Sequence, residues 1–367
     1  MNSTYDIFIK SYGCSFNRFR SQRLAELLSE DFSVYDQSYG SDRSFFRDAE
    51  EESVACDAGY VVVYTCPITG YLEKLSDDFI RHIKEINPVA TVIVTGCSVP
   101  DTDSSLKTGR VVFLPDADVA GYLGERNGSR ARKNVRQDTS GSIGTLLIKA
   151  GCGNGCTYCI CPRSNRVENV PFADIRTEIN RLIGRGFTTI EFGGPCVGDW
   201  VDPETKAFTF SDLLGYVLSE THLNIANLEL YPTDFTDDLI ALLTHERIDK
   251  DISIPIQSGS DTMLGRMGRK YTKARLEKIL DMLFSTIPNA HITTDIIVGS
   301  PNETRNDLKE TLDLLKRYDF SRIDTYMYSA TRSADTSARG NSRDSFLELL
   351  GTEKYHDLAK KINLTSR

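Results

Sequence analysis

Residues 151–159 of the chain read GCGNGCTYC and place Cys152, Cys156 and Cys159 at the spacing C-x3-C-x2-C. The stretch directly follows the apolar run Leu146–Ala150, which predicts a buried strand. Three thiolates can hold a 4Fe–4S cube by three of its irons and leave the fourth iron open to a small molecule. The glycines between them let the backbone pass close to a bulky cluster. The stretch therefore favours a catalytic iron–sulfur cluster.

Zinc is the alternative ligand for the same cysteines. It usually takes four ligands, commonly from paired C-x2-C units or from cysteines together with histidines. The sequence has no histidine between His82 and His222. However, Cys161 is close enough in sequence to supply a fourth thiolate, so the spacing alone leaves a zinc site open.

Three more cysteines each follow a predicted strand near the start of the chain. The pairs are Ile7–Tyr12 with Cys14, Tyr60–Tyr64 with Cys66, and Thr91–Thr95 with Cys97. In a parallel sheet the carboxyl ends of the strands share one edge, and ligands bind there. We therefore expect these cysteines to converge on a second cluster, with buried cysteines packed as small hydrophobes as the alternative.

The rest of the first domain contains predicted helices and a surface insertion. Helical spacing is present over Arg20–Ser29 and Leu72–Asn87, and the polar, acidic segment Gln37–Ser53 is expected to be exposed. Residues 126–136 carry five basic residues and precede Asp138–Ser142, so this region predicts an interdomain linker. A solvated charge run is the simplest interpretation of it, and an RNA contact is the alternative.

From Gly144 onward, predicted strands alternate with helical segments such as Phe172–Arg185 and Asn306–Tyr318. Six β/α units predict a parallel barrel that is two units short of a closed eightfold barrel. A final helix is expected over Ser345–Ile362. The six strands are Gly144–Ala150, Thr189–Phe192, Asn227–Leu230, Asp251–Ile256, His291–Val298 and Arg322–Tyr328.

These segments predict an α/β chain with four parts. Residues 1–125 form an amino-terminal parallel-sheet α/β domain, residues 126–142 a linker, residues 143–340 a partial (β/α)6 barrel, and residues 341–367 a helical tail. With 367 residues, 40% of them apolar, the chain can bury cores of this size.

Composition limits the possible locations and partners. No run is apolar enough to span a bilayer, the first ten residues lack a signal peptide's apolar core, and no membrane association is expected. The nine cysteines then indicate reduced thiols or metal ligands in the cytoplasm. A net charge of −9 argues against bulk attraction to nucleic acid but permits a local basic patch.

The cysteine motif and the sequence around it resemble a known enzyme family. C-x3-C-x-aromatic-C after a first strand resembles the radical S-adenosylmethionine (SAM) superfamily. The flanking sequence is similar to one of its branches, the methylthiotransferases that modify tRNA or a ribosomal protein. The likeness covers nearly the whole chain. Its motifs are IPIQSGSD at 254–261, MGRKYT at 267–272, TDIIVG at 294–299, ET at 303–304 and YS at 328–329.

The resemblance implies two 4Fe–4S clusters and SAM as cofactors, with a reductant such as flavodoxin or ferredoxin. Cys152, Cys156 and Cys159 would hold the catalytic cluster. The second, auxiliary cluster would be bound by Cys14, Cys66 and Cys97. An asparagine three residues after the first of these is usual in the family, and Asn17 matches it; the second usually follows Asn-Thr, but here it follows Tyr64-Thr65.

The resemblance also implies SAM-binding positions at the carboxyl ends of the barrel strands. Tyr158 and the strand end at Val298 would contact the adenine, and the turn at Gly193 and Gly194 would lie near the SAM amino group. Arg163 and Arg166 are candidates to meet a carboxylate or phosphate, with ordinary exposed arginines as the alternative. Cys196 could be a ligand, but a packed thiol is the favoured role. Gln257, Ser258 and Asp295 complete the predicted cofactor-binding set, with turn capping the simpler role for the first two.

The implied activity is insertion of sulfur, or transfer of a methylthio group, at a C–H carbon. Within the family, the motifs are most similar to the branch that acts on N6-threonylcarbamoyladenosine in tRNA. That branch normally continues into a small β-rich RNA-binding (TRAM) domain, and too few residues follow the predicted barrel for one here. A peptide, protein or small metabolite is therefore the alternative substrate.

Two other classes of protein are alternatives for this chain. A cobalamin-dependent radical SAM methyltransferase would also join an α/β domain to such a barrel. The chain has five histidines, however, and none stands in a D-x-H-x-x-G setting that would ligate cobalt. A binding module with structural zinc is disfavoured because the cysteines form triads rather than tetrads.

Overall fold

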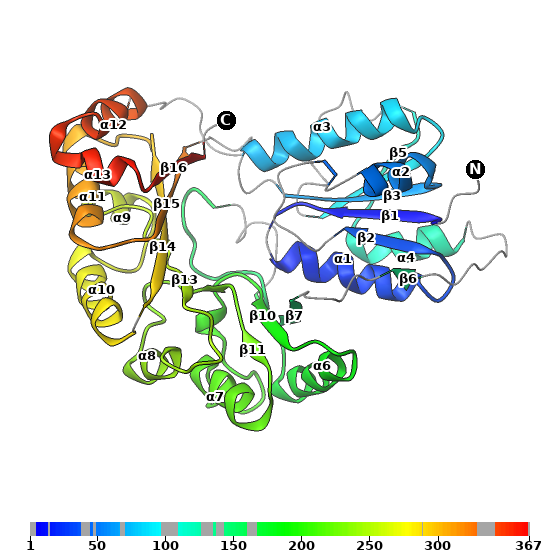
Figure 1. Ribbon diagram of the computed structural model, residues 1–367, viewed down its shortest axis with the longest axis horizontal. Coiled ribbons are helices and arrows are strands. Elements are labelled where there is room, and N and C mark those ends of the chain that lie inside the picture. The colour runs from blue at the N-terminus through cyan, green and yellow to red at the C-terminus, as the bar shows by residue number, and fades with distance from the viewer. Residues whose placement is uncertain are drawn as a thin grey trace. The chain divides into compact units, whose positions relative to one another are not determined.

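The computed structural model divides the chain into two compact units, Met1–Thr145 and Leu146–Arg367. Figure 1 shows the elements of both. Several predicted residues lie outside the described ranges: Cys14, Cys97, Cys161, Arg163, Arg166 and most of the basic segment 126–136. The structure describes residues 5–13, 15–37, 45–46, 49–66, 70–96, 109–125, 135–136, 143–159, 167–287, 289–328 and 342–365.

The first unit is built on a parallel six-stranded sheet with the order β5-β4-β3-β1-β2-β6. Its three predicted strands are all present. The strands are β1 (Ile7–Ser11), β2 (Val34–Gln37), β3 (Tyr60–Thr65), β4 (Thr91–Gly96), β5 (Val111–Phe113) and β6 (Val135–Arg136).

Helices cover both faces of this sheet (Figure 1). On one face lie α1 (Ser15–Leu28) and α4 (Asp116–Gly124), and on the other α2 (Ala49–Asp57) and α3 (Gly70–Ile86). Successive strand residues point to opposite faces, so the strands feed two separate apolar clusters. Such continuous apolar strands are typical of a parallel sheet that is buried on both sides.

Two predictions for this unit need correction. The segment Gln37–Ser53 is not simply a surface insertion, because Gln37 ends β2, α2 begins at Ala49, and Glu51 is fully buried. Its carboxylate accepts hydrogen bonds from Tyr35 and Gln37. The predicted linker is also shorter than expected, because Val135–Arg136 forms the edge strand β6 beside β2. The acidic composition of this segment did not indicate the helix α2, which buries the carboxylate of Glu51.

The second unit contains the predicted partial barrel. One three-stranded sheet has the order β11-β10-β7, and a five-stranded parallel sheet has the order β12-β13-β14-β15-β16. The strands are β7 (Gly144–Leu147), β10 (Thr189–Gly193), β11 (Asn224–Ile225), β12 (Leu228–Glu229), β13 (Asp251–Ser253), β14 (His291–Val298), β15 (Arg322–Met327) and β16 (Ile362–Thr365).

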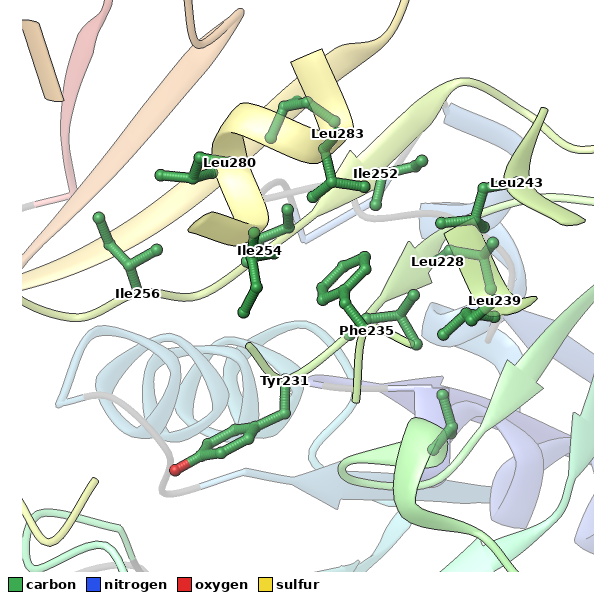
Figure 2. Close-up of a cluster of buried hydrophobic side chains, with 14 of the residues drawn as sticks. Leu228, Tyr231, Phe235, Leu239, Leu243, Ile252, Ile254, Ile256, Leu280 and Leu283 are labelled. Carbon is green, nitrogen blue, oxygen red and sulfur yellow. The ribbon is translucent and has the colours of Figure 1, made fainter. Parts of the chain in front are cut away.

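Helices cover the outer face of these sheets and bury one continuous apolar core against them. Figure 2 shows part of this core, where Leu239 and Leu243 of one helix and Leu280 and Leu283 of another lie in one cluster with strand residues such as Ile252 and Ile254. The helices are α6 (Phe172–Gly184), α7 (Phe210–Glu220), α8 (Asp237–Leu243), α9 (Asp261–Arg266), α10 (Lys273–Thr286), α11 (Arg305–Arg317) and α12 (Ser342–Leu350).

Three segments of this unit differ from the predictions. The helix expected over Ser345–Ile362 is instead α12, the short helices η3 (Glu353–Tyr355) and α13 (His356–Ala359), and the strand β16. That strand pairs with β15 in parallel, so these residues extend the barrel sheet and are not a purely helical tail. Asn227 has a left-handed φ of 53° and therefore stays outside β12. The run Gly144–Ala150 divides into β7 and β8 (Lys149–Ala150), which leaves to pair with β9 (Glu168–Asn169).

Candidate iron–sulfur sites

The cysteine loop of the second unit is held at its base and along its side. Its two ends form the antiparallel pair β8–β9, with Lys149 opposite Asn169 and Ala150 opposite Glu168. Farther along the loop, the Thr157 N–H donates to the carbonyl of Met267 at 3.0 Å, and its hydroxyl donates to that of Arg266 at 3.0 Å. The segment after α9 therefore supports the stretch that carries the last two cysteines.

The three predicted cysteines lie in the same loop but have different surroundings. Cys152 and Cys156 are buried, and Cys159 is half-buried. The Sγ atom of Cys152 lies 3.4 Å from that of Cys196, and the Asn154 side chain donates to Cys196 Sγ at 3.2 Å. The hydrogen bond between the two thiols lowers the pKa of Cys152 to about 6 and raises the pKa of Cys196. The site thus favours one thiolate on Cys152.

Arg269 lies beside the second cysteine of the loop. Its guanidinium donates to Cys156 Sγ at 3.5 Å and to the Tyr158 hydroxyl at 3.1 Å. It also donates to the Tyr271 hydroxyl at 2.6 Å and to the carbonyl of Pro255. Burial raises the pKa of Tyr158. Tyr158, predicted as an adenine contact, is therefore fixed in place by a cation.

The strand end at Gly193 and Gly194 packs tightly against β8. Gly194 has a φ of 131°, and a Cβ atom there would lie 2.3 Å from the carbonyl oxygen of Lys149. Only glycine permits this approach, so the predicted Gly-Gly turn is a packing requirement at this edge. The buried Lys149 ammonium pairs with Asp199, which follows the same turn.

The predicted SAM-binding residues Gln257, Ser258 and Val298 lie in different surroundings. Gln257 is buried with a left-handed φ of 66°, and its backbone pairs with Ile296 of β14. The Ser258 hydroxyl lies 3.1 Å from that of Thr311 on α11, which fits turn stabilisation. Val298 is buried at the end of β14. Whether any of these residues contacts SAM stays a prediction.

Asp295 is a partly buried carboxylate on β14. Burial, followed by the nearby charges of Glu229 and Asp324, raises its pKa to about 7, and Arg322 and Arg269 oppose that rise. Desolvation by the surrounding protein also raises the pKa of the neighbouring Glu229, although part of this residue is exposed to solvent. This barrel site therefore contains one carboxylate, Asp295, with a pKa near neutral, beside a second carboxylate whose pKa is also raised.

In the first unit, two glycines close in on the strand end that carries Cys66. A Cβ atom on Gly13 would lie 2.5 Å from Cys66 Cβ, and one on Gly96 would lie 2.6 Å from the carbonyl oxygen of Thr65. Their φ values are 104° and 101°, which again favours glycine. These glycines directly precede Cys14 and Cys97 in the sequence. The chain thus passes close to Cys66 immediately before both other predicted ligands.

Asn17 links the same strand ends. Its buried side-chain amide donates to the carbonyls of Tyr12 and Thr65, each at 2.9 Å. The Thr65 hydroxyl donates to the carbonyl of Thr95 at 2.9 Å and so connects β3 to β4. Tyr64, which departs from the family's usual residue, turns away and donates to Asp116 of α4.

The donor chemistry at both places fits clusters with thiolate ligands. Among the described residues, no group of three or more His, Cys, Asp or Glu is placed to hold a single metal ion. Zinc gathers its ligands around one point, whereas the cysteines of a 4Fe–4S cluster bind separate irons. In the first unit, the Thr95 hydroxyl is buried with no hydrogen-bond partner in the described structure, next to where the cluster is expected.

Sequence reasoning missed the charged residues around the cysteine loop. The motif MGRKYT contains Arg269 without indicating a role for it, and Lys149, Asp199 and Glu229 belong to no motif. Lys149 begins β8 and Glu229 ends β12, whereas Asp199 ends the short helix η2 (Val197–Asp199) and Arg269 lies between α9 and α10. An ionisable residue inside an otherwise apolar strand, such as Lys149, was the available signal.

The chain matches two family models. Residues 146–315 match the radical SAM superfamily, and residues 6–113 match an uncharacterized protein family, UPF0004. In the part of the chain that the structure describes, no helix is long and apolar enough to cross a membrane.

Curated relatives span both units. A tRNA-2-methylthio-N(6)-dimethylallyladenosine synthase of Moorella thermoacetica is 28% identical over 390 residues, covering 97% of this chain and 83% of the relative. The threonylcarbamoyladenosine tRNA methylthiotransferase MtaB of Thermotoga maritima is 27% identical over 340 residues, covering 88% of this chain and 74% of the relative.

Solved structures share the fold at low sequence identity. The radical SAM methyltransferase TsrM of Kitasatospora setae, with cobalamin and a 4Fe–4S cluster bound, has a TM-score of 0.60 at 14% identity, covering 88% of this chain and 75% of that one. The cobalamin-dependent SAM radical enzyme OxsB has a TM-score of 0.54 at 12% identity, covering 99% and 58%. At such identities the likeness shows the fold alone.

Proposed function

Because this chain belongs to the radical SAM methylthiotransferase family, with SAM and two 4Fe–4S clusters as its cofactors, we propose that it methylthiolates a modified adenosine in tRNA. One observation carries the substrate: a relative named for such a tRNA adenosine aligns with 97% of the chain, across both units. The likeness is therefore not confined to the barrel that all radical SAM enzymes share.

The two cysteine triads have separate roles in this proposal. Cys152, Cys156 and Cys159 hold the cluster that binds SAM, and Cys14, Cys66 and Cys97 hold the auxiliary cluster. The cofactors supply a carbon-centred radical that removes hydrogen from an unactivated C–H bond, and the sulfur that replaces it.

The chain's own residues bind and orient these groups. Arg269 fixes Tyr158 and Cys156, and the Gly194 backbone together with the Lys149–Asp199 pair fixes the strand end beside Cys152. Such fixed partners keep reacting groups within reach of each other, which lowers the entropic part of the barrier. Tyr158, Gly193, Gly194, Gln257, Ser258, Asp295 and Val298 remain the proposed SAM-binding set.

The experiment that tests the substrate is a comparison of nucleosides. Digested tRNA from cells with and without the gene is analysed by mass spectrometry. The expected result is loss of one 2-methylthio adenosine, and its side group distinguishes the dimethylallyl from the threonylcarbamoyl substrate. Complementation by the wild-type chain, but not by Cys156→Ala, links the loss to this enzyme. Unchanged tRNA with a methylthio group missing from a peptide would overturn the proposal.

A binding assay tests tRNA recognition independently of chemistry. The protein has a net charge of −9, so only a local basic patch can bind the phosphates of tRNA. We propose residues 126–136 as this patch. Affinity should then fall steeply with salt, because each neutralised phosphate releases counterions. Changing Arg126, Arg130, Arg132 and Arg136 to glutamine should weaken binding and flatten the salt dependence. No measurable binding at low salt would contradict a tRNA substrate.

The remaining parts of the proposal concern location and electron supply. A 4Fe–4S cluster with an open iron needs a reducing compartment, so we place the enzyme in the cytoplasm with flavodoxin or ferredoxin as its reductant. Titration of the oxidised clusters with reduced flavodoxin tests the electron supply, and a failure to reduce either cluster would exclude this donor.

A further inference from the structure

The guanidinium of Arg269 is a half-buried cation in direct contact with thiol, hydroxyl, carbonyl and aromatic groups. It donates to the Cys156 thiol, to the hydroxyls of Tyr158 and Tyr271, and to the carbonyl of Pro255. Its carbon Cζ lies 4.4 Å from the ring centroid of Tyr231 and 5.1 Å from that of Tyr271. Two aromatic faces and four hydrogen bonds therefore fix its position.

This cation has no carboxylate partner among the described residues, although other arginines of the unit do. Arg305 and Arg317, for example, pair with Glu348 and Glu277 at 2.8 and 2.9 Å. Removing a charge from water is costly unless an opposite charge or a full set of hydrogen bonds compensates it. Among the groups that touch Arg269 is the thiol of Cys156, one of the three proposed ligands. The carboxylates of Glu229 and Asp295 feel this positive charge only from beyond ion-pair distance, so the cation lies directly against the cysteine loop.

We propose that Arg269 is a positioning residue for this loop and that its positive charge raises the reduction potential of the cluster bound there. The inference rests on the proposed assignment of that cluster to Cys152, Cys156 and Cys159. Reduction adds one negative charge to the cluster, so a fixed cation stabilises the reduced form more than the oxidised form. Net charge and hydrogen bonds to sulfur are among the main determinants of such potentials.

The test is a redox titration of the full-length protein under anaerobic conditions. Wild type, Arg269→Gln, Arg269→Lys and the surface control Arg317→Gln are reconstituted with iron and sulfide. Electron paramagnetic resonance then follows the signal that changes when SAM is added. In Arg269→Gln, the ratio of reduced to oxidised cluster at a fixed potential should fall about tenfold, equivalent to a 59 mV shift for one electron. Arg269→Lys should lie between this variant and wild type, and Arg317→Gln should match wild type.

The outcomes separate this inference from the proposed function. If wild type binds no SAM-responsive cluster, the proposed function fails, whatever the variants do. If wild type binds it and Arg269→Gln has the same iron content and the same potential, the role of Arg269 is overturned.

A second measurement decides the case in which Arg269→Gln does not fold. Wild-type protein labelled with 15N-arginine should show a weak nitrogen hyperfine coupling to the reduced cluster, because an N–H group contacts Cys156 Sγ. The coupling should vanish in Arg269→Lys. Its absence from the wild-type spectrum would overturn the inference without any variant.

Discussion

The two cysteine sites are assembled in opposite ways. In the first unit, strand ends that are distant in sequence are brought together by close backbone packing at Gly13 and Gly96 and by the Asn17 amide. In the second unit, one short loop carries all three cysteines, and charged side chains such as Arg269 and Lys149 support it.

This difference separates the forces on which each site depends. A site made of neutral groups at strand ends depends on the sheet being folded and tightly packed, and it has little reason to respond to pH. A site made of one loop and buried charges can lose a ligand without losing the fold, but it depends on electrostatics. Substitutions at the two sites should therefore have effects of different kind and size.

The largest effect concerns the chemistry of the two triads. Cys156→Ala should abolish reductive cleavage of SAM, whereas Cys66→Ala should leave cleavage intact and abolish the methylthio product. The reason is that only the loop in the barrel has the compact spacing for a SAM-binding cluster. Separate assays of methionine release and of product formation measure the two steps.

Iron content provides the control for that pair. Wild type should bind about eight irons, and replacing Cys152, Cys156 and Cys159 together should halve the number. A methylthio product from the Cys66→Ala protein, or zinc in place of iron after anaerobic purification, would contradict the assignment.

The next prediction compares a glycine required by close packing with a glycine required only by its positive φ. Gly13→Ala should destabilise the first unit by about 2–4 kcal/mol, because its Cβ would overlap Cys66 in addition to the cost of a positive φ. Gly155 also has a positive φ, of 70°, but a Cβ there would meet nothing within 4 Å, so Gly155→Ala should cost only about 1 kcal/mol. Urea unfolding of both variants measures the difference. Equal losses would mean that close packing does not hold the first site together.

A smaller effect is expected from the amide that links the strand ends. Asn17→Ala should cost about 2–3 kcal/mol, since two buried carbonyls lose their donor. Asn306→Ala is the matched control, because it removes only an exposed hydrogen bond to Glu310. Hydrogen exchange should show faster opening confined to β1 and β3. Exchange that also accelerates in the barrel would show that the two units are not independent.

The smallest effect is a pH dependence that only the barrel should show. Burial raises the pKa of Asp295 to about 7, so the folded chain keeps a proton that the unfolded chain releases above pH 4. A shift of about three pKa units would correspond to about 4 kcal/mol for a fully buried group. Because Asp295 is only partly buried, stability of the second unit should fall by about 1–2 kcal/mol as the pH rises from 4 to 7. Asp295→Asn should remove this slope. Thermal unfolding across that range measures it, and an unchanged slope in the variant would assign the titration to another group.

The sequence was sufficient for the parts of the fold that are set by local pattern. Continuous apolar runs such as Tyr60–Tyr64 predicted buried parallel strands, and His291–Val298 matches β14 to the residue. The cysteine loop followed from spacing alone. Strand ends in a parallel sheet share an edge, so even the neighbourhood of Cys66 was predictable from strand order.

The rest depended on contacts that have no local signal. Strand β16 is recognised only by its pairing with β15, and its residues also fit a helix. The approach of Cys196 to Cys152 joins residues from different strand ends. The cation–π contact of Arg269 with Tyr231 and its hydrogen bond to Tyr158 join three separate segments. Such pairings are set by tertiary packing, which a periodic pattern does not encode.

The short ladder between β8 and β9 has a consequence for how the cysteine loop was able to evolve. The ladder closes the loop at its base through Lys149, Ala150, Glu168 and Asn169, so the segment between them leaves and re-enters the barrel at one place. Closing a loop costs free energy that grows only slowly with its length. The loop can therefore accept insertions or substitutions while the barrel strands keep their register. Its sequence can change during evolution with little effect on the stability of the barrel.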